Sequence, residues 1–239
     1  MNLHLLEALR IDAHELQNQL RHEREMNERA EKERVSDEYF TRVSTANDML
    51  TKSYTDEDTL LDPILPRQGV VALVGSSDSG KSSLLRGLAM AIVAGKEEYI
   101  GFALHPRYHR AMYISTEDDE VSLSRLMRMQ IMDGDIATYS GLHFVFDTDN
   151  LLETIELGLK SNTPDLVIID AFADLYTGPM NENNRVRSFI NAFQQLAVKY
   201  NTLVIFLHHT GKRTESLAPS KHNAIGSQGF EAKMRLMME

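Results

Sequence analysis

The sequence contains no cysteine and no tryptophan, and only 6 of its 239 residues are proline. The lack of cysteine excludes a disulfide framework, a thiolate zinc site and a thiol nucleophile. No apolar run approaches the ~20 residues that span a bilayer. The N-terminus also lacks the basic start and apolar core of a secretory signal. These absences favour a protein of the reducing cytoplasm without a membrane partner, and a hydrophobic content of 42% excludes wholesale disorder.

Acidic residues outnumber basic ones by 35 to 25, which gives a formal net charge of −10. A chain with this charge does not coat nucleic acid with its whole surface. Beyond Asn201 the balance reverses, with five basic and three acidic residues. A local basic loop could still bind nucleic acid, and only the C-terminal part has the charge that this requires.

Residues 3–34 have the pattern of one helix. Apolar residues follow a and d spacing over barely two heptads, at Leu6, Leu9, Ala13, Leu16 and Leu20. After Leu20 the segment is almost entirely charged, which is typical of a solvated spacer helix. A short coiled coil or a helix that docks on a protein partner is the alternative. Residues 35–68 are predicted to form a connector, because Pro63 and Pro66 and several polar residues interrupt any periodicity.

From residue 70 onward, short apolar runs alternate with longer amphipathic segments. The runs predict buried strands at Val70–Val74, Ala111–Ser115, His143–Phe146, Leu166–Ile169 and Leu203–Leu207. The longer segments predict helices at Lys81–Ala94, Glu120–Met132, Leu151–Lys160 and Arg185–Tyr200. This alternation predicts an α/β fold, a mainly parallel sheet with helices on both faces, preceded by an N-terminal helical extension.

The same pattern predicts the domain boundaries. Residues 1–60 are expected to form the N-terminal helix and linker, and residues 61–239 the α/β domain. A last stretch, Phe230–Met238, predicts the start of another strand. Because it stops at Glu239 without a cap or turn, we interpret the chain as lacking its natural C-terminus.

Residues 75–82, GSSDSGKS, match the phosphate-binding pattern G-x-x-x-x-G-K-[ST]. A predicted strand ends at Val74 and a predicted helix begins near Lys81, so backbone N–H groups and a helix N-terminus would surround a phosphate. Lys81 is expected at the β- and γ-phosphates and the Ser82 hydroxyl on Mg²⁺. The predicted nucleotide-binding residues are Gly75, Ser76, Ser77, Asp78, Ser79, Gly80, Lys81, Ser82 and Ser83.

Three further strand ends carry polar groups at the same predicted edge of the sheet. Asp170 follows an apolar run and is predicted to hold the Mg²⁺ water shell. Glu117 follows another run and is predicted to hold the attacking water, while Asp118 or Asp119 caps the next helix. His208 and His209 follow a third run, and neighbouring strand residues point to opposite faces. We therefore expect one of them, His209, to contact the γ-phosphate.

These motifs resemble those of the RecA-fold motor ATPases, and within them the hexameric replicative helicases of the plasmid RepA type and related phage or mobile-element ATPases. The resemblance runs from about Leu65 to the end of the chain. It is carried by LPRQGVVALVGSSDSGKSS, YISTEDD, DLVIIDAF, LVIFLHHTGK and GSQGFEAKMR. The resemblance implies ATP and Mg²⁺ as cofactors, Glu117 as the group that activates water, and a homo-oligomer, expected to be a hexamer.

The resemblance also implies roles across subunits and on DNA. Lys233 and Arg235 lie where such helicases carry an arginine finger, which reaches the γ-phosphate of a neighbouring protomer. The loops at 174–184 and 211–225 correspond to loops that contact single-stranded DNA. The first loop is acidic or neutral and departs from that pattern. The second loop provides the predicted phosphate-backbone contacts, Lys212, Arg213 and Lys221.

The leading interpretation is therefore a ring-forming, Mg²⁺-dependent ATPase that acts on single-stranded DNA in the replication or mobilisation of a mobile element. The alternative is an ATPase switch that regulates a protein partner through the N-terminal helix. A small-molecule kinase would leave Glu117 and the two histidines without a role. A GTPase lacks support because the sequence has no Asn-Lys-x-Asp segment to recognise guanine.

Overall fold

In the computed structural model the chain forms two compact units, Met1–Asp56 and Glu57–Glu239, and each is described by itself. The structure describes residues 3–51, 59–131, 135–180, 182–211, 220 and 228–239. Within the first unit, the side chains of residues 3–16, 36–38, 40 and 42 lie outside this description.

The first unit consists of two helices, α1 (Leu3–Arg42) and α2 (Ala46–Thr51). Helix α1 continues past the predicted end at residue 34, because residues 35–42 contain neither glycine nor proline to stop it. Thr45 and Asp48 then cap α2 reciprocally, with each side chain accepting a hydrogen bond from the other residue's backbone N–H at 3.1 Å. The described part of the apolar stripe is Leu20, which is 47% exposed.

The second unit is built on a six-stranded sheet in which every neighbouring pair is parallel. The strands lie in the order β10, β3, β9, β8, β6, β7. Their bounds are β3 Gly69–Gly75, β6 Ala111–Ser115, β7 Leu142–Val145, β8 Leu166–Asp170, β9 Leu203–His209 and β10 Leu236–Met238. The predicted α/β class with a parallel sheet is confirmed.

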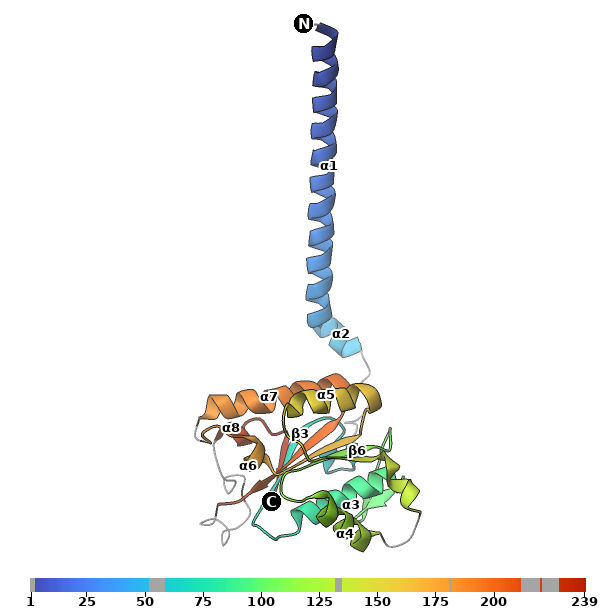
Figure 1. Cartoon of the computed structure of the whole chain (residues 1–239), viewed down its shortest axis with the longest axis vertical. Helices are drawn as coiled ribbons and strands as arrows, with labels where there is room; N and C mark the ends of the chain where they lie inside the picture. Colours follow the sequence, from blue (N-terminus) through green and yellow to red (C-terminus); the bar gives the residue numbers. More distant parts are fainter. Residues whose placement is uncertain (1–2, 52–58, 132–134, 181, 212–219, 221–227) are drawn as a thin grey trace. The chain divides into compact units, whose positions relative to one another are not determined.

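Helices cover both faces of this sheet, with α3 and α4 on one face and α5 and α7 on the other (Figure 1). Their bounds are α3 Lys81–Val93, α4 Glu120–Gln130, α5 Leu151–Asn162 and α7 Asn183–Tyr200. Alternate residues of each strand enter the two apolar cores. In β3, for example, Val71 packs towards α3 and Val70 towards α7. None of the helices in the described residues is both long and apolar enough to cross a membrane.

Several short elements were not predicted. Two small antiparallel pairs precede α3 and follow it, β1 (Thr59–Leu61) with β2 (Leu65–Pro66) and β4 (Glu98–Tyr99) with β5 (Phe102–Ala103). A 3₁₀ helix, η1 (Ile136–Gly141), leads into β7, and a short helix, α6 (Phe172–Leu175), follows β8.

The predicted strand Phe230–Met238 is partly wrong. Its first residues belong to a short helix, α8 (Gln228–Glu231), and only Leu236–Met238 form a strand. The reason is the packing of Phe230, which is 1% exposed and lies against the rings of Phe172 and His208. A helical turn places this ring in the core, and the chain then returns to pair with β3.

Candidate functional site

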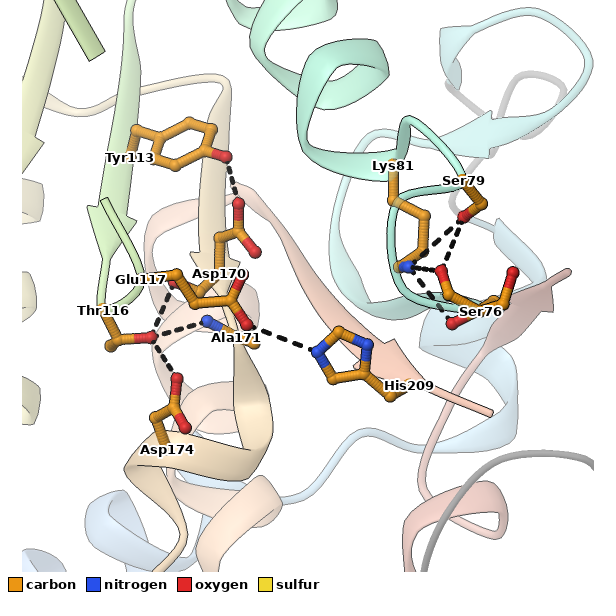
Figure 2. A network of polar contacts seen from close by, with 11 residues as sticks. Ser76, Ser79, Lys81, Tyr113, Thr116, Glu117, Asp170, Ala171, Asp174 and His209 are labelled. Carbon is orange, nitrogen blue, oxygen red and sulfur yellow. Dashed lines mark hydrogen bonds and ion pairs between the residues drawn. The ribbon is translucent and has the colours of Figure 1, made fainter. Parts of the chain in front are cut away.

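The phosphate loop connects the carboxyl end of β3 to the first turn of α3. Lys81 opens the helix, and its ammonium group donates to the carbonyl oxygens of Gly75 at 3.1 Å and Ser76 at 2.5 Å (Figure 2). Gly80 has a φ of 87°, a left-handed conformation that favours glycine at this turn. The loop and the helix N-terminus together form the wall of a cavity of about 500 Å³.

Five predicted residues meet in this cavity, because β3, β6, β8 and β9 lie in one sheet and end at the same edge of it. Lys81 and Ser82 come from the phosphate loop and α3. Asp170 ends β8, Glu117 follows β6, and His209 ends β9 directly beside Gly75. Of the other predicted nucleotide-binding residues, the cavity wall includes Ser77, Asp78, Ser79, Gly80 and Ser83.

Acidic side chains lie around the ammonium group of Lys81. Burial lowers the pKa of its ammonium group, and the carboxylates of Asp170 and Glu117 act in the opposite direction. A cation held between loop carbonyls and two carboxylates is suited to bind the oxygens of a polyphosphate, for which charge-assisted hydrogen bonds are the stronger kind. The cavity therefore combines a fixed positive charge with backbone donors of the loop.

Glu117 and His209 face one another in the cavity. The Nε2 atom of His209 lies 3.3 Å from Oε1 of Glu117, and the two side chains are 28% and 48% exposed (Figure 2). His208 points to the opposite face of the sheet, where its ring lies 5.3 Å from that of Phe172. His209 thus faces the cavity and His208 faces the core, as the strand geometry predicted.

The residues after Glu117 begin helix α4. The Asp119 carboxylate caps the helix by accepting from the Ser122 N–H at 2.7 Å. A hydrogen bond with the Ser122 side chain, and then this backbone contact, lower the pKa of Asp119. Asp118 lies in the cavity wall, and its carbonyl oxygen accepts from the Ser115 hydroxyl at 2.8 Å. The capping role predicted for this acidic segment therefore falls to Asp119.

Asp170 is buried, with 6% of its surface exposed, and its carboxylate accepts a hydrogen bond from the Tyr113 hydroxyl (Figure 2). Burial, and then the Asp170 charge, raise the pKa of Tyr113 far above its usual value, so the hydroxyl keeps its proton and donates. On the other side of Asp170, the Thr116 hydroxyl lies 2.9 Å from both the Asp170 carbonyl oxygen and the Ala171 nitrogen.

The donor set in the cavity fits Mg²⁺. Ser82 offers a hydroxyl oxygen and Asp170 a carboxylate oxygen, which are the hard ligands that this ion takes from proteins alongside phosphate oxygens and water. Within the described residues no group of three or more His, Cys, Asp or Glu side chains could hold a metal. That part of the chain thus shows no metal site formed by protein ligands alone. A site that nucleotide oxygens complete does not require such a group of ligands.

Sequence reasoning missed two buried side chains, one beneath the cavity and one in its wall. Tyr113 is the first, and its only sequence signal is a hydroxyl within an apolar strand. Arg86 is the second, the one charged residue of α3 after Lys81. Arg86 is 1% exposed, and its Nε donates to Gln130 at 2.6 Å and its Nη2 to Ser83 at 3.2 Å.

The remaining predicted residues lie elsewhere. The backbone N–H of Arg235 donates to the carbonyl oxygen of Val70 at 2.9 Å, near the start of β3, so Arg235 and Lys233 lie at the other end of the sheet from their own phosphate loop. The predicted DNA contacts Lys212, Arg213 and Lys221 lie outside the described residues.

A comparison with protein families agrees with this site. A model of the AAA domain matches residues 36–215, about three quarters of the chain. No curated protein matches the chain. The match includes the phosphate loop, the strand ends that carry Glu117, Asp170 and His209, and the other residues of the cavity wall. The chain therefore belongs to the AAA domain family of P-loop ATPases.

Proposed function

We propose that the chain hydrolyses ATP with Mg²⁺, and that Glu117 activates the attacking water. The observation that carries this proposal is the position of Glu117. Its carboxylate lies beside His209, in the same cavity as the phosphate loop, and it is 48% exposed, so water reaches it. A carboxylate within hydrogen-bond reach of the attacking water can act as its general base.

In the proposed reaction, water attacks the γ-phosphorus, and the bond from that phosphorus to the β,γ-bridging oxygen breaks. The Glu117 carboxylate accepts the proton that the water loses, and the products are ADP and inorganic phosphate. Lys81 donates hydrogen bonds to the β- and γ-phosphate oxygens as negative charge develops on them. His209 orients the Glu117 carboxylate and contacts the γ-phosphate. Ser82 and Asp170 would hold Mg²⁺, which supplies further neutralisation of the phosphate charge.

We further propose that copies of the chain form a ring, expected to be a hexamer, which moves on single-stranded DNA like a replicative helicase in the replication or mobilisation of a mobile element. The resemblance to RepA-type helicases supports this proposal, as does the reversed charge balance beyond Asn201. The placement of Arg235 away from its own phosphate loop is also consistent with a role in a neighbouring protomer.

The test is the rate of phosphate release from ATP, measured with Mg²⁺ or EDTA and with or without single-stranded DNA. We expect hydrolysis only with Mg²⁺ and a higher rate with DNA.

The DNA affinity should also fall as salt rises, and each lost phosphate contact removes about 0.7 from the slope of log affinity against log salt. The triple alanine variant that should flatten this slope changes Lys212, Arg213 and Lys221. A control triple changes three exposed basic residues of the ATPase unit, Lys96, Lys160 and Arg185.

A second function is favoured by the separate helical unit. Helix α1 is 40 residues long, and its described side chains from residue 17 onward are exposed. Under this alternative the nucleotide state regulates a protein partner through α1. Hydrolysis that DNA leaves unchanged, together with a partner that is lost when residues 1–56 are removed, would favour the switch over the helicase.

A further inference from the structure

Beneath the phosphate cavity, β6 and β8 run side by side with their residues in register. Ser115 pairs with Asp170, and Tyr113 pairs with Ile168 two residues earlier. Alternate residues of a strand share one face. Tyr113 therefore lies on the α3 side of the sheet, and its ring extends along the sheet so that the hydroxyl reaches the Asp170 carboxylate (Figure 2).

The contact between Tyr113 and Asp170 is buried. Tyr113 is 1% exposed, and its ring packs 5.6 Å from that of Phe144. Among the described residues, Tyr113 is the one side chain that donates a hydrogen bond to the Asp170 carboxylate. The hydrogen bond involves one carboxylate oxygen, Oδ2. The other oxygen, Oδ1, has no protein partner in that part of the chain. The tyrosine thus fixes the rotation of the carboxylate and leaves one oxygen for another ligand.

A buried cation of the same cavity, Arg86, does not pair with this carboxylate. Arg86 lies in the same cavity wall, yet its guanidinium bonds to Gln130 and Ser83, and within the described residues it forms no ion pair with a carboxylate. A guanidinium on Asp170 would neutralise the charge that a divalent cation needs. A hydroxyl donor orients the carboxylate and leaves it with its full negative charge.

We propose that Tyr113 is a positioning residue for Mg²⁺, acting through the Asp170 carboxylate. This inference rests on the proposed function, because it concerns the same Mg²⁺ site. Partners that bond to a metal-binding side chain set its orientation, and their loss typically weakens metal affinity by about 10–100-fold. The role of Tyr113 is therefore separable from the binding of the nucleotide phosphates by the loop.

The test uses the full chain with Tyr113→Phe, which removes the hydroxyl and keeps the ring in its core position. Mn²⁺ serves as the probe, and electron paramagnetic resonance measures free Mn²⁺ in the presence of a slowly hydrolysed ATP analogue. We expect the variant to bind Mn²⁺ about 10-fold more weakly in this ternary complex. Binding of the same analogue in EDTA should match that of the wild type.

The matched control is Tyr99→Phe. Like Tyr113, Tyr99 donates one hydrogen bond from its hydroxyl group. Its acceptor is the carbonyl oxygen of Leu84 in α3, at 2.6 Å, and Tyr99 lies away from Asp170. This control should bind Mn²⁺ like the wild type.

Three outcomes would overturn the inference: an unchanged Mn²⁺ affinity in Tyr113→Phe, an equal loss in Tyr99→Phe, or a matching loss of analogue binding in EDTA. Wild-type protein that releases phosphate from ATP equally fast with Mg²⁺ and with EDTA would instead refute the proposed Mg²⁺-dependent function itself.

Discussion

The Glu117 carboxylate and the His209 imidazole lie 3.3 Å apart, although 92 residues separate them in the sequence. They meet because β6 and β9 flank β8 and all three strands end at one edge of the sheet. His209 pairs with Gly75, so the contact forms next to the phosphate loop. A carboxylate held by an imidazole at this position can accept a proton from water while its orientation stays fixed.

Replacing Glu117 with glutamine should separate binding from hydrolysis. The amide keeps the shape of the side chain and loses the base, and removal of a general base typically slows a reaction about 10²–10⁴-fold. We expect the Kd for ATP to remain near that of the wild type while phosphate release falls within this range. Glu120→Gln, an exposed neighbour in the first turn of α4, is the control. Full turnover by Glu117→Gln would move the role to another residue such as Asp118.

Replacing His209 with asparagine should slow hydrolysis less than the loss of Glu117 does. The variant loses the contact that orients Glu117, and a hydrogen bond to a charged group contributes about 1.5–3 kcal/mol, or roughly 10–100-fold in rate. The measurement is kcat for phosphate release at saturating ATP. His143→Asn, on an exposed position of β7, should retain the wild-type rate. Equal rates in the two variants would contradict a role for His209.

Replacing Lys81 with alanine should abolish detectable binding of ATP. The ammonium group is the positive side chain at the phosphate loop, and its loss leaves the carboxylates of Asp170 and Glu117 facing the phosphates. Calorimetric titration with ATP and Mg²⁺ measures the effect. Lys96→Ala, at an exposed position after α3, controls for the change in net charge. An unchanged Kd in Lys81→Ala would show that the nucleotide binds elsewhere.

The fold and the phosphate loop could be predicted because their signals are local. Each central strand is an apolar run that the sheet buries on both faces, and the structure extends the runs by one or two residues. The loop is defined by the spacing of Gly75, Gly80 and Lys81 alone. The positions of Glu117 and Asp170 follow from a general property of parallel sheets, in which strand ends meet at one edge.

The contacts beneath the cavity could not be predicted in the same way. Tyr113 reaches Asp170 across 57 residues because β6 is the neighbour of β8, and strand order has no local signal. Arg86 is held by Gln130, which is 44 residues away at the end of another helix. The helical turn at Phe230 depends likewise on the rings that surround it in the core.

The stability of the ATPase unit should depend on Glu156 at neutral pH and less so in acid. Glu156 joins α5 to α7, with hydrogen bonds from Lys199 at 2.8 Å and Tyr200 at 3.1 Å. These bonds, and a third from Lys160, lower the pKa of Glu156 from its ordinary 4.5 to about 2. A lowered pKa in the folded state contributes stability above the ordinary pKa, and this contribution is lost as the pH falls from about 4.5 towards 2.

Thermal unfolding of the wild type and Glu156→Gln tests this dependence. The variant should unfold at a lower temperature at pH 7, and the two Tm values should converge as the pH falls below about 4.5. Glu153→Gln, an exposed residue on the same helix, should show no such convergence. A difference in Tm that stays constant with pH would show that the carboxylate charge is not the cause.

Arg235 provides the sharpest test of shared sites between protomers. It lies beside Val70, and Gly75 is five residues further along β3, which at ~3.3 Å per residue is about 16 Å away. Its own phosphate loop is therefore out of reach, so the proposed contact of Arg235 with a γ-phosphate requires the site of a neighbouring copy. Arg235→Ala should bind ATP nearly as the wild type does and hydrolyse it slowly, as expected of a group that acts on transition-state charge.

Mixing two inactive variants separates action within one chain from action between chains. Lys81→Ala has a defective pocket and an intact Arg235, while Arg235→Ala has the reverse, so some interfaces in a mixed ring combine two intact halves. We expect the mixture to recover part of the wild-type rate of phosphate release. Lys81→Ala mixed with Glu117→Gln should recover none, since every pocket then carries a defect. If the first mixture also stays inactive, and sedimentation with ATP and Mg²⁺ finds only monomers, the ring fails and the nucleotide switch becomes the better account of this ATPase.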